Sequence, residues 1–253
     1  MQTTSYVIEQ QLQHRSVRKF LETPVPDAQL EAIIGAAQRA STSSSLQVWS
    51  VIAVRDADRK QRIADALGGF AYISTAPVFL VWVADFARNA HIIESQGGDP
   101  ENPRFIENTL IGALDSGIAA EKALLAAESL GLGGVYVGGV RNNPAAISAE
   151  LGLPKHVFPL VGMSIGTPDP TEGTCLKPRL PLGGVLHHER YDADAWRDAV
   201  PQHEVDYREY YEGQGVPDRS WSRTVKGRLG TLKGMHGRHT MRDSLRAQGF
   251  DAE

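Results

Sequence analysis

The sequence predicts a domain in which helices and buried strands are interspersed, and three observations carry this prediction. Two apolar runs, at residues 48–54 and 76–84, have the length and the β-branched content of buried strands. Apolar residues recur every three or four positions over residues 105–130, which is the spacing of one helix face. Hydrophobic residues make up 42% of the 253 residues, which is enough for a full core in one large domain or in two small ones.

Three shorter helices are predicted before the second strand. Residues 5–13 have weak helical periodicity, and Asp27 is the expected N-cap of a stronger helix. Residues 56–67 form a third helical pattern, which Gly68 and Gly69 end. The helix at Asp27 has its apolar residues at helical spacing, namely Leu30, Ile33, Ile34 and Ala37.

The long helical pattern at residues 105–130 follows a loop at 95–104 that contains two glycines and two prolines. Two further strands, at 133–140 and 158–166, are separated by a short helix over residues 144–151. Small residues on many sides of the long helix suggest burial against more than one partner, and its large apolar residues form much of its apolar face, namely Ile106, Leu110, Leu114, Ile118, Leu125 and Leu130.

The composition changes beyond about residue 186, where polar, aromatic and basic residues increase and strand patterns stop. This change predicts a helical extension. Residues 219–246 contain eight Lys or Arg and one Asp, in a chain whose net charge is −4. The basic segment has two interpretations: a nucleic-acid-binding tail on a degenerate core, or a tail that lies on protein or offers its cations to anionic cofactors.

The sequence predicts a soluble cytoplasmic protein. Its single cysteine, Cys175, cannot form an internal disulfide, which fits a reducing cytosol. The longest apolar run, at residues 76–84, is far shorter than the ~20 residues of a membrane helix. The N-terminus has no apolar run behind a basic start, so it does not resemble a signal peptide.

Several common motifs are excluded by their context. "GMSIG" at 162–166 matches the nucleophile elbow of a serine hydrolase, but Pro168 and Pro170 exclude the helix that this motif requires. Ser164 is therefore interpreted as a strand residue. The glycines of 131–139 lie between a helix and a strand, in the reverse order of a dinucleotide fingerprint. The chain has no P-loop, and its histidine clusters lack other ligands at metal spacing, so no metal site is predicted.

Two cationic stretches and one hydroxyl-rich loop are the remaining candidates for a binding site. "HRSVRKF" at 14–20 and "KPRLP" at 177–181 place cations at short spacing, which suits a phosphate or a solvated surface. "STSSS" at 41–45 offers hydroxyl and N–H groups to phosphate or ribityl oxygens. Gly138 and Gly139 allow a flat or bulky ligand to approach the backbone closely.

These motifs occur in one order: "HRSVRKF", "RASTSSSLQ", "AAESLGLGGVYVGGVRNNP", and "KPRLP" after the strand "FPLVGMSIG". In this combination the chain resembles the nitroreductase superfamily, within it the oxygen-insensitive NADPH nitroreductase and flavin reductase group. The resemblance covers nearly the whole chain and is strongest over residues 14–182. It implies an α+β fold with a central, mostly antiparallel sheet flanked by helices, in an intertwined homodimer. It also implies an FMN-binding core at 1–185 and a helical extension at 186–253 that wraps the partner or the core.

The activity that the resemblance implies is that of an FMN-dependent NAD(P)H oxidoreductase. FMN is expected at the dimer interface, with NADPH or NADH as the electron donor. Small-molecule acceptors, namely nitroaromatics, quinones or free flavins, then take the electrons in a ping-pong cycle. Neither nucleic acid nor a membrane is an expected partner. The expected catalytic residue is Arg18, whose cation would lie beside the N1–O2 edge of the flavin, where negative charge develops.

The resemblance also implies which residues bind FMN. His14 and Ser16 are expected near its phosphate, Lys177 and Arg179 form a second phosphate cluster, and Tyr136 belongs to the segment packed against the ring. The complete set of expected FMN ligands is His14, Arg15, Ser16, Arg18, Ser41, Thr42, Ser43, Tyr72, Tyr136, Gly138, Gly139, Lys177 and Arg179.

The sequence departs from the pattern of the group at two places. Phe70 stands where the group usually carries glutamine, and an FMN hydrogen bond is expected to be lost there, while Tyr72 still contacts the flavin region. Gln214 stands at a position where the group has an arginine for the 2′-phosphate of NADPH. Arg219 is then the candidate residue for NAD(P)H binding.

Overall fold

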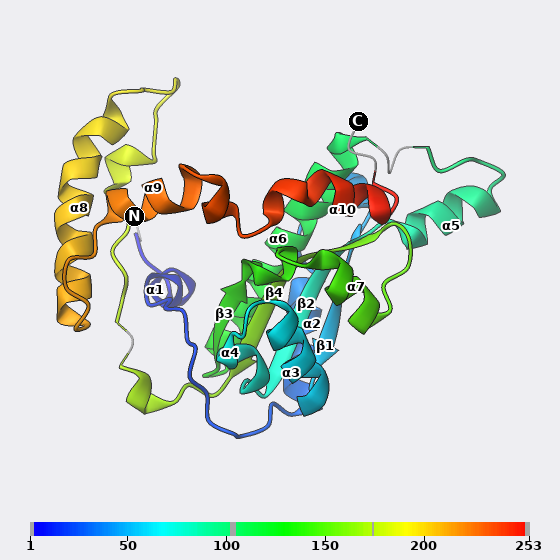
Figure 1. Cartoon of the computed structure of the whole chain (residues 1–253), viewed down its shortest axis with the longest axis horizontal. Helices are drawn as coiled ribbons and strands as arrows, with labels where there is room; N and C mark the ends of the chain where they lie inside the picture. Colours follow the sequence, from blue (N-terminus) through cyan, green and yellow to red (C-terminus); the bar gives the residue numbers. More distant parts are fainter. Residues whose placement is uncertain (1–2, 102–104, 174, 251–253) are drawn as a thin grey trace. The chain divides into compact units, whose positions relative to one another are not determined.

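Four strands pair in an antiparallel sheet with the order β1-β2-β4-β3 (Figure 1). The structure is a computed structural model, and the residues that it describes are 3–101, 105–173 and 175–250. The strands are β1 (Trp49–Val54), β2 (Val78–Asp85), β3 (Gly133–Val137) and β4 (Val157–Gly166). The predicted α+β fold with an antiparallel sheet is therefore confirmed.

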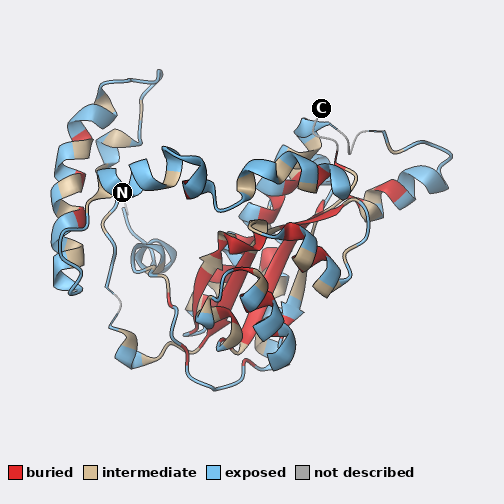
Figure 2. Ribbon diagram, viewed as in Figure 1, coloured by how far each residue is buried: buried red, intermediate tan, exposed pale blue. Residues whose placement is uncertain are grey.

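Helices cover both faces of this sheet, so β2 is buried along almost its whole length (Figure 2). Because side chains alternate along a strand, Leu80 and Trp82 pack into a cluster on one face, and Val81 and Val83 pack into a cluster on the other. The helices of the first face are α2 (Asp27–Ala37) and α6 (Ile106–Ser129), and those of the second are α3 (Ala57–Ala66), α4 (Ala71–Ser74) and α7 (Pro144–Leu151).

The sheet belongs to a compact unit that is built from two separate parts of the sequence, Met1–Thr174 and Thr240–Glu253. The second part contains α10 (Met241–Ala247). Beyond it, Phe250 is fully buried and meets Phe158 and a third phenylalanine, Phe86, edge to face. The C-terminal segment therefore completes the hydrophobic core of this unit.

The second compact unit comprises Cys175–His239. Its two helices are α8 (Ala195–Gly213) and α9 (Trp221–Leu229). They are joined by aromatic packing, since the buried His203 ring meets the Trp221 ring edge to face at 4.9 Å between centroids. The chain thus folds as helices after the last strand.

The boundaries of these units differ from the division drawn from the sequence. The core was placed at 1–185 and the extension at 186–253, whereas the compact units change at 174/175 and at 239/240. The functional division at 185/186 stays a prediction. No helix in the described residues combines the length and the apolar character that a membrane span requires.

One local prediction was wrong, and one helix was missed. Asp27 is the first residue of α2 and does not cap it; Pro26 is the N-cap, and the Asp27 carboxylate pairs with Arg55. Helix α5 (Ala87–Ser95) occupies a segment for which no helix was predicted. Its only buried residue is Ala90, so it lacks the apolar stripe that reveals a helix in a sequence. The predicted loop at 95–104 follows it, with residues 102–104 lying outside the described residues.

Helix α6 confirms the predicted long helix, and its small residues, not its large apolar ones, form the side that packs on the sheet. The side chains that pack on the sheet are small or polar, with one leucine: Gly112, Asp115, Ser116, Ala119, Ala120, Ala123, Leu124 and Ala127. Four large side chains point away from the core at intervals of four residues, and we call them the α6 stripe: Ile106, Leu110, Leu114 and Ile118. Leu114 is 64% exposed. Small residues let the helix approach the sheet closely. The bulky residues lie on the side of the helix that faces away from this core.

Candidate functional site

The N-terminal cationic motif is an extended segment that runs beside β3. The Val17 N–H donates to the Gly134 carbonyl at 2.9 Å, and Phe20 forms an isolated bridge with Pro168. Val17 and Phe20 are buried in a small cluster with Tyr72. Arg15 and Arg18, two of the motif's cations, are exposed, so burying the apolar residues leaves these two charges available to a ligand.

A turn after β4 fixes the backbone of this motif. The Arg18 N–H donates to Oε1 of Glu172 at 2.9 Å, and Oε2 of Glu172 is buried without a hydrogen-bond partner among the described residues. Lys19 donates to the Thr171 hydroxyl at 2.6 Å and lies 3.3 Å from the Asp169 carboxylate. Sequence reasoning missed Glu172, because this carboxylate lies in a loop without a recognisable pattern.

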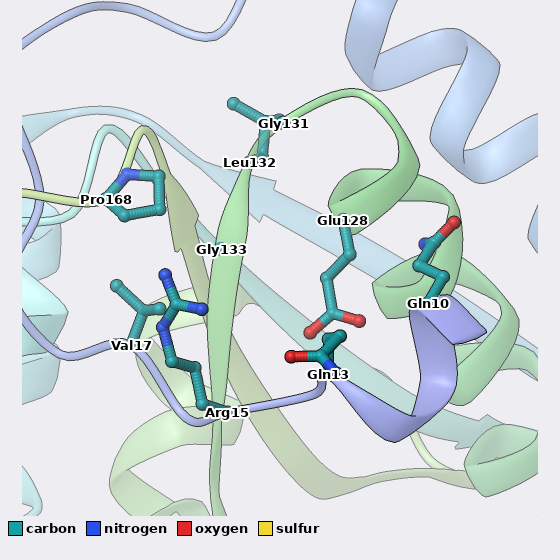
Figure 3. A pocket seen from close by; sticks show the side chains of 9 residues that line it. All are labelled: Gln10, Gln13, Arg15, Val17, Glu128, Gly131, Leu132, Gly133 and Pro168. Carbon is teal, nitrogen blue, oxygen red and sulfur yellow. The ribbon is translucent and has the colours of Figure 1, made fainter. Parts of the chain in front are cut away.

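The other end of the motif lines an open pocket of about 240 Å³ (Figure 3). His14 Nδ1 lies 2.6 Å from Oε1 of Glu128, which projects from α6. The pocket residues come from α1 (Tyr6–Leu12) and the segment after it, from the end of α6 and the residues up to the start of β3, and from the loop after β4, and they are Gln10, Gln13, Arg15, Val17, Glu128, Gly131, Leu132, Gly133 and Pro168. The arginine brings a cation to this pocket.

An aromatic cluster lies beside the N-terminal motif, since Val17 and Phe20 of the motif pack in one cluster with Tyr72. Burial raises the pKa of the Tyr72 hydroxyl, and the Arg18 cation lowers it by a smaller amount. The Phe70 and Tyr72 rings stack at 5.6 Å between centroids. A Cβ added to Gly139 would lie 2.9 Å from the Phe70 ring, so only glycine permits this approach. The fold therefore brings the motif, the Phe70 and Tyr72 rings and Gly139 together from three parts of the sequence.

Tyr136 lies apart from this cluster. Its ring packs with the core on the α6 face of the sheet, whereas Phe70 and Tyr72 pack with the core on the opposite face. Its hydroxyl donates to Oε2 of Glu121 at 3.0 Å, and burial together with the carboxylates of Glu121 and Glu128 raises the pKa of Tyr136. The Tyr136 hydroxyl is therefore hydrogen-bonded to a residue of α6.

The hydroxyl loop is tied to α6 through a buried carboxylate, Asp115. The Thr42 hydroxyl donates to Asp115 at 2.5 Å, and the Ser43 N–H donates to it at 3.1 Å. The side chains of Ser41 and Ser43 are exposed. Sequence reasoning missed Asp115, because only the structure shows that this carboxylate lies on the buried face of α6.

The second cationic motif lies in the unit of residues 175–239. The Arg179 guanidinium donates to the Lys177 carbonyl at 3.0 Å. The Lys177 ammonium and the Arg219 guanidinium lie 5.4 and 4.6 Å from the ring centroid of Tyr211. Burial raises the pKa of Tyr211, but Lys177, the Tyr207 hydroxyl and Arg219 lower it by more. The Tyr211 ring is thus close to both Lys177, a predicted FMN ligand, and Arg219, the predicted NAD(P)H ligand.

Three other candidates from the sequence have defined surroundings. Ser164 is fully buried in β4, and its hydroxyl donates to the Tyr72 carbonyl at 2.7 Å, so its interpretation as a strand residue is confirmed. Cys175 is exposed, with its sulfur 3.5 Å from the Gln214 amide nitrogen. Across the described ranges, no group of three or more His, Cys, Asp or Glu side chains is placed to hold a metal ion.

The fold is an antiparallel sheet between two layers of helices, with arginines beside its β3 edge. Comparison with known sequences identifies the family. The nitroreductase family matches residues 12–167, and the C-terminal domain of the same family matches residues 177–253. The chain belongs to the nitroreductase family.

Individual relatives extend this result over the whole chain. An NADPH-flavin oxidoreductase of Vibrio harveyi is 42% identical over 88% of this chain and 90% of its own length. An FMN reductase [NAD(P)H] of Bacillus subtilis is 39% identical over 98% of both chains. The solved structure of the NADPH:FMN oxidoreductase from Vibrio harveyi, complexed with NAD⁺, has a TM-score of 0.86 at 39% identity and covers 98% of this chain and 99% of that one.

Proposed function

We propose that the protein is an FMN-dependent NAD(P)H oxidoreductase that reduces nitroaromatics, quinones or free flavins. The observation that carries this proposal is that the motif with the exposed Arg15 and Arg18 packs against Tyr72, in a member of the nitroreductase family. The names of the relatives agree with it. None of the relatives reported above is named as a nucleic-acid-binding protein, so the alternative of a nucleic-acid-binding tail gains no support.

The donor set of the first unit fits FMN. Within the described residues Arg15 and Arg18 form no ion pair with a carboxylate, so their charges are free to meet an anion. The orphaned Oε2 of Glu172 requires a donor, and FMN carries N–H and O–H groups. The residues proposed to hold FMN are those predicted from the sequence: His14, Arg15, Ser16, Arg18, Ser41, Thr42, Ser43, Tyr72, Tyr136, Gly138, Gly139, Lys177 and Arg179.

Bound FMN supplies the redox chemistry by accepting a hydride from NAD(P)H and passing electrons to a second substrate. The chain supplies charge and orientation. Arg18 stabilises negative charge at the reacting end, and its position is fixed because Glu172 holds its backbone N–H. Tyr72 is protonated at neutral pH, as an ordinary tyrosine is, and burial raises its pKa further, so it can act as a hydrogen-bond donor and adds no negative charge. No side chain is required as a general base.

The protein is further proposed to act as a homodimer. The α6 stripe presents four large aliphatic side chains at four-residue spacing to one side of a helix. Such a continuous apolar surface is typical of an interface between subunits. The resemblance predicts FMN at that interface, so dimerisation and cofactor binding are expected to depend on each other.

The colour of the purified protein tests the proposed function. We expect a yellow protein with the absorbance bands of oxidised flavin, which bleach when NADPH or NADH is added without oxygen. Adding a quinone or a nitroaromatic compound should then restore the bands. A colourless protein that takes up no added FMN would refute the proposal.

Arg219 is expected to favour NADPH over NADH. Replacing Arg219 with alanine should raise KM for NADPH about tenfold and leave KM for NADH nearly unchanged, because a guanidinium bound to phosphate contributes about 1.5–3 kcal/mol. Steady-state kinetics with both donors measure this difference. Arg223→Ala, an exposed arginine on α9, is the matched control and should change neither value. Equal effects on the two donors would contradict the assignment of Arg219.

A further inference from the structure

The loop after α2 has a strained backbone that needs an anchor. Ser44, Ser45 and Gln47 have φ values of 47°, 57° and 53°, in the left-handed region that non-glycine residues rarely adopt. Such a conformation persists only where surrounding contacts determine it. Two elements supply contacts to this loop: Arg88 and Asn89 of α5 donate to the Gln47 and Leu46 carbonyls, and one side chain of α6 holds the residues at the start of the loop.

Asp115 is that anchor. It is 3% exposed, and its two oxygens accept from different groups, Oδ2 from the Thr42 hydroxyl at 2.5 Å and Oδ1 from the Ser43 N–H at 3.1 Å. The Thr42 oxygen itself accepts from the Gln47 N–H at 2.9 Å, so its one proton is directed to Asp115. Because both oxygens act as acceptors, the group has the hydrogen-bonding pattern of a carboxylate.

The charge of this carboxylate limits what the loop can bind. Asp115 forms no ion pair with any Lys, Arg or His among the described residues, so no cation is in direct contact with its carboxylate. A buried negative charge behind the exposed Ser41 and Ser43 hydroxyls repels a phosphate. Uncharged hydroxyl groups are not repelled, and they exchange hydrogen bonds readily with serine side chains.

We propose that Asp115 is a positioning residue of the flavin site, and that the loop it holds receives the uncharged ribityl hydroxyls of the flavin while the phosphate is bound by the cationic motifs. This inference rests on the proposed function. Asp115 does not touch the ligand; it acts through Thr42 and Ser43, which it holds in place. The sequence motif alone left phosphate and ribityl oxygens as equal alternatives for this loop.

Riboflavin and FMN test the proposal because they differ only in the phosphate. Dissociation constants for both are measured by flavin fluorescence on the full-length protein after its flavin has been removed. Asp115→Ala should raise both constants about tenfold and leave their ratio unchanged. Arg179→Ala, in a predicted phosphate cluster, should instead bring the two constants closer together. Asp58→Ala, an exposed aspartate on α3, is the control and should change neither.

Thr42→Val and Asp115→Asn keep the test decisive if Asp115→Ala does not fold. Each should raise both constants by the same factor, with little change in the thermal midpoint of the flavin-free protein. A weakening confined to FMN, a tightening of FMN alone in Asp115→Asn, or unchanged constants in all three variants would overturn the proposal. Wild-type protein that binds neither flavin would instead refute the proposed function.

Discussion

Replacing Leu114 with glutamate is expected to convert the proposed dimer into monomers that lose the proposed flavin. Leu114 is 64% exposed at the middle of the α6 stripe. Each large aliphatic side chain buried at an interface contributes about 1.5–3 kcal/mol, and a carboxylate in its place must be desolvated without a partner. The substitution acts on both subunits, so its cost is doubled.

Analytical ultracentrifugation and the flavin absorbance of the purified variant measure the two effects together. Ala57→Glu introduces the same charge at an exposed site on α3 and should leave both the mass and the flavin content unchanged. A Leu114→Glu protein that remains dimeric with full flavin content would show that the α6 stripe does not form the interface. A monomer that keeps its flavin would show that the cofactor is held within one chain.

The second large effect is expected from Arg18→Ala, which should slow flavin reduction about a hundredfold while weakening FMN binding much less. The reason is that a preorganised cation beside developing negative charge acts mainly on the reaction, and removing one such group commonly costs about 10²–10³ in rate. Stopped-flow absorbance under anaerobic NADPH measures the reduction rate, and fluorescence titration measures FMN binding.

Lys19 provides the matched control for Arg18. It is the next cation in the chain, but its ammonium is held by Thr171 and Asp169 and is 57% exposed. Lys19→Ala should therefore retain FMN and its reduction rate. If Arg18→Ala abolished FMN binding while the remaining holoenzyme was reduced at the normal rate, Arg18 would belong to the phosphate and not to the ring.

Secondary structure was largely predictable because strands and helices here differ in the period of their apolar residues. The strand at 76–84 and the helix at 144–151 were predicted within two residues of β2 and α7. The orientation of α6 was not predictable in the same way. A periodic pattern shows that Leu110 and Leu114 belong to an apolar face, but not whether that face packs on its own sheet or on another molecule.

The candidate site was predictable only where its residues are adjacent in sequence. Arg15 and Arg18 were found because they belong to one short motif. The carboxylates of Asp115, Glu128 and Glu172 are far apart in sequence and meet the motif and the loop only after folding. A charged residue that holds a site residue in place is therefore seen in the structure, whereas the sequence pattern hardly reveals it.

The burial of Phe250 has a consequence for biosynthesis. The first unit takes its last core residue from a segment that is translated after the whole of Cys175–His239. While the ribosome is still adding residues 175–239, the cluster of Phe86 and Phe158 lacks the Phe250 side chain that completes it. Final consolidation of the sheet-bearing unit is thus expected after translation has passed residue 250, and nascent chains stalled before that point should be protease-sensitive.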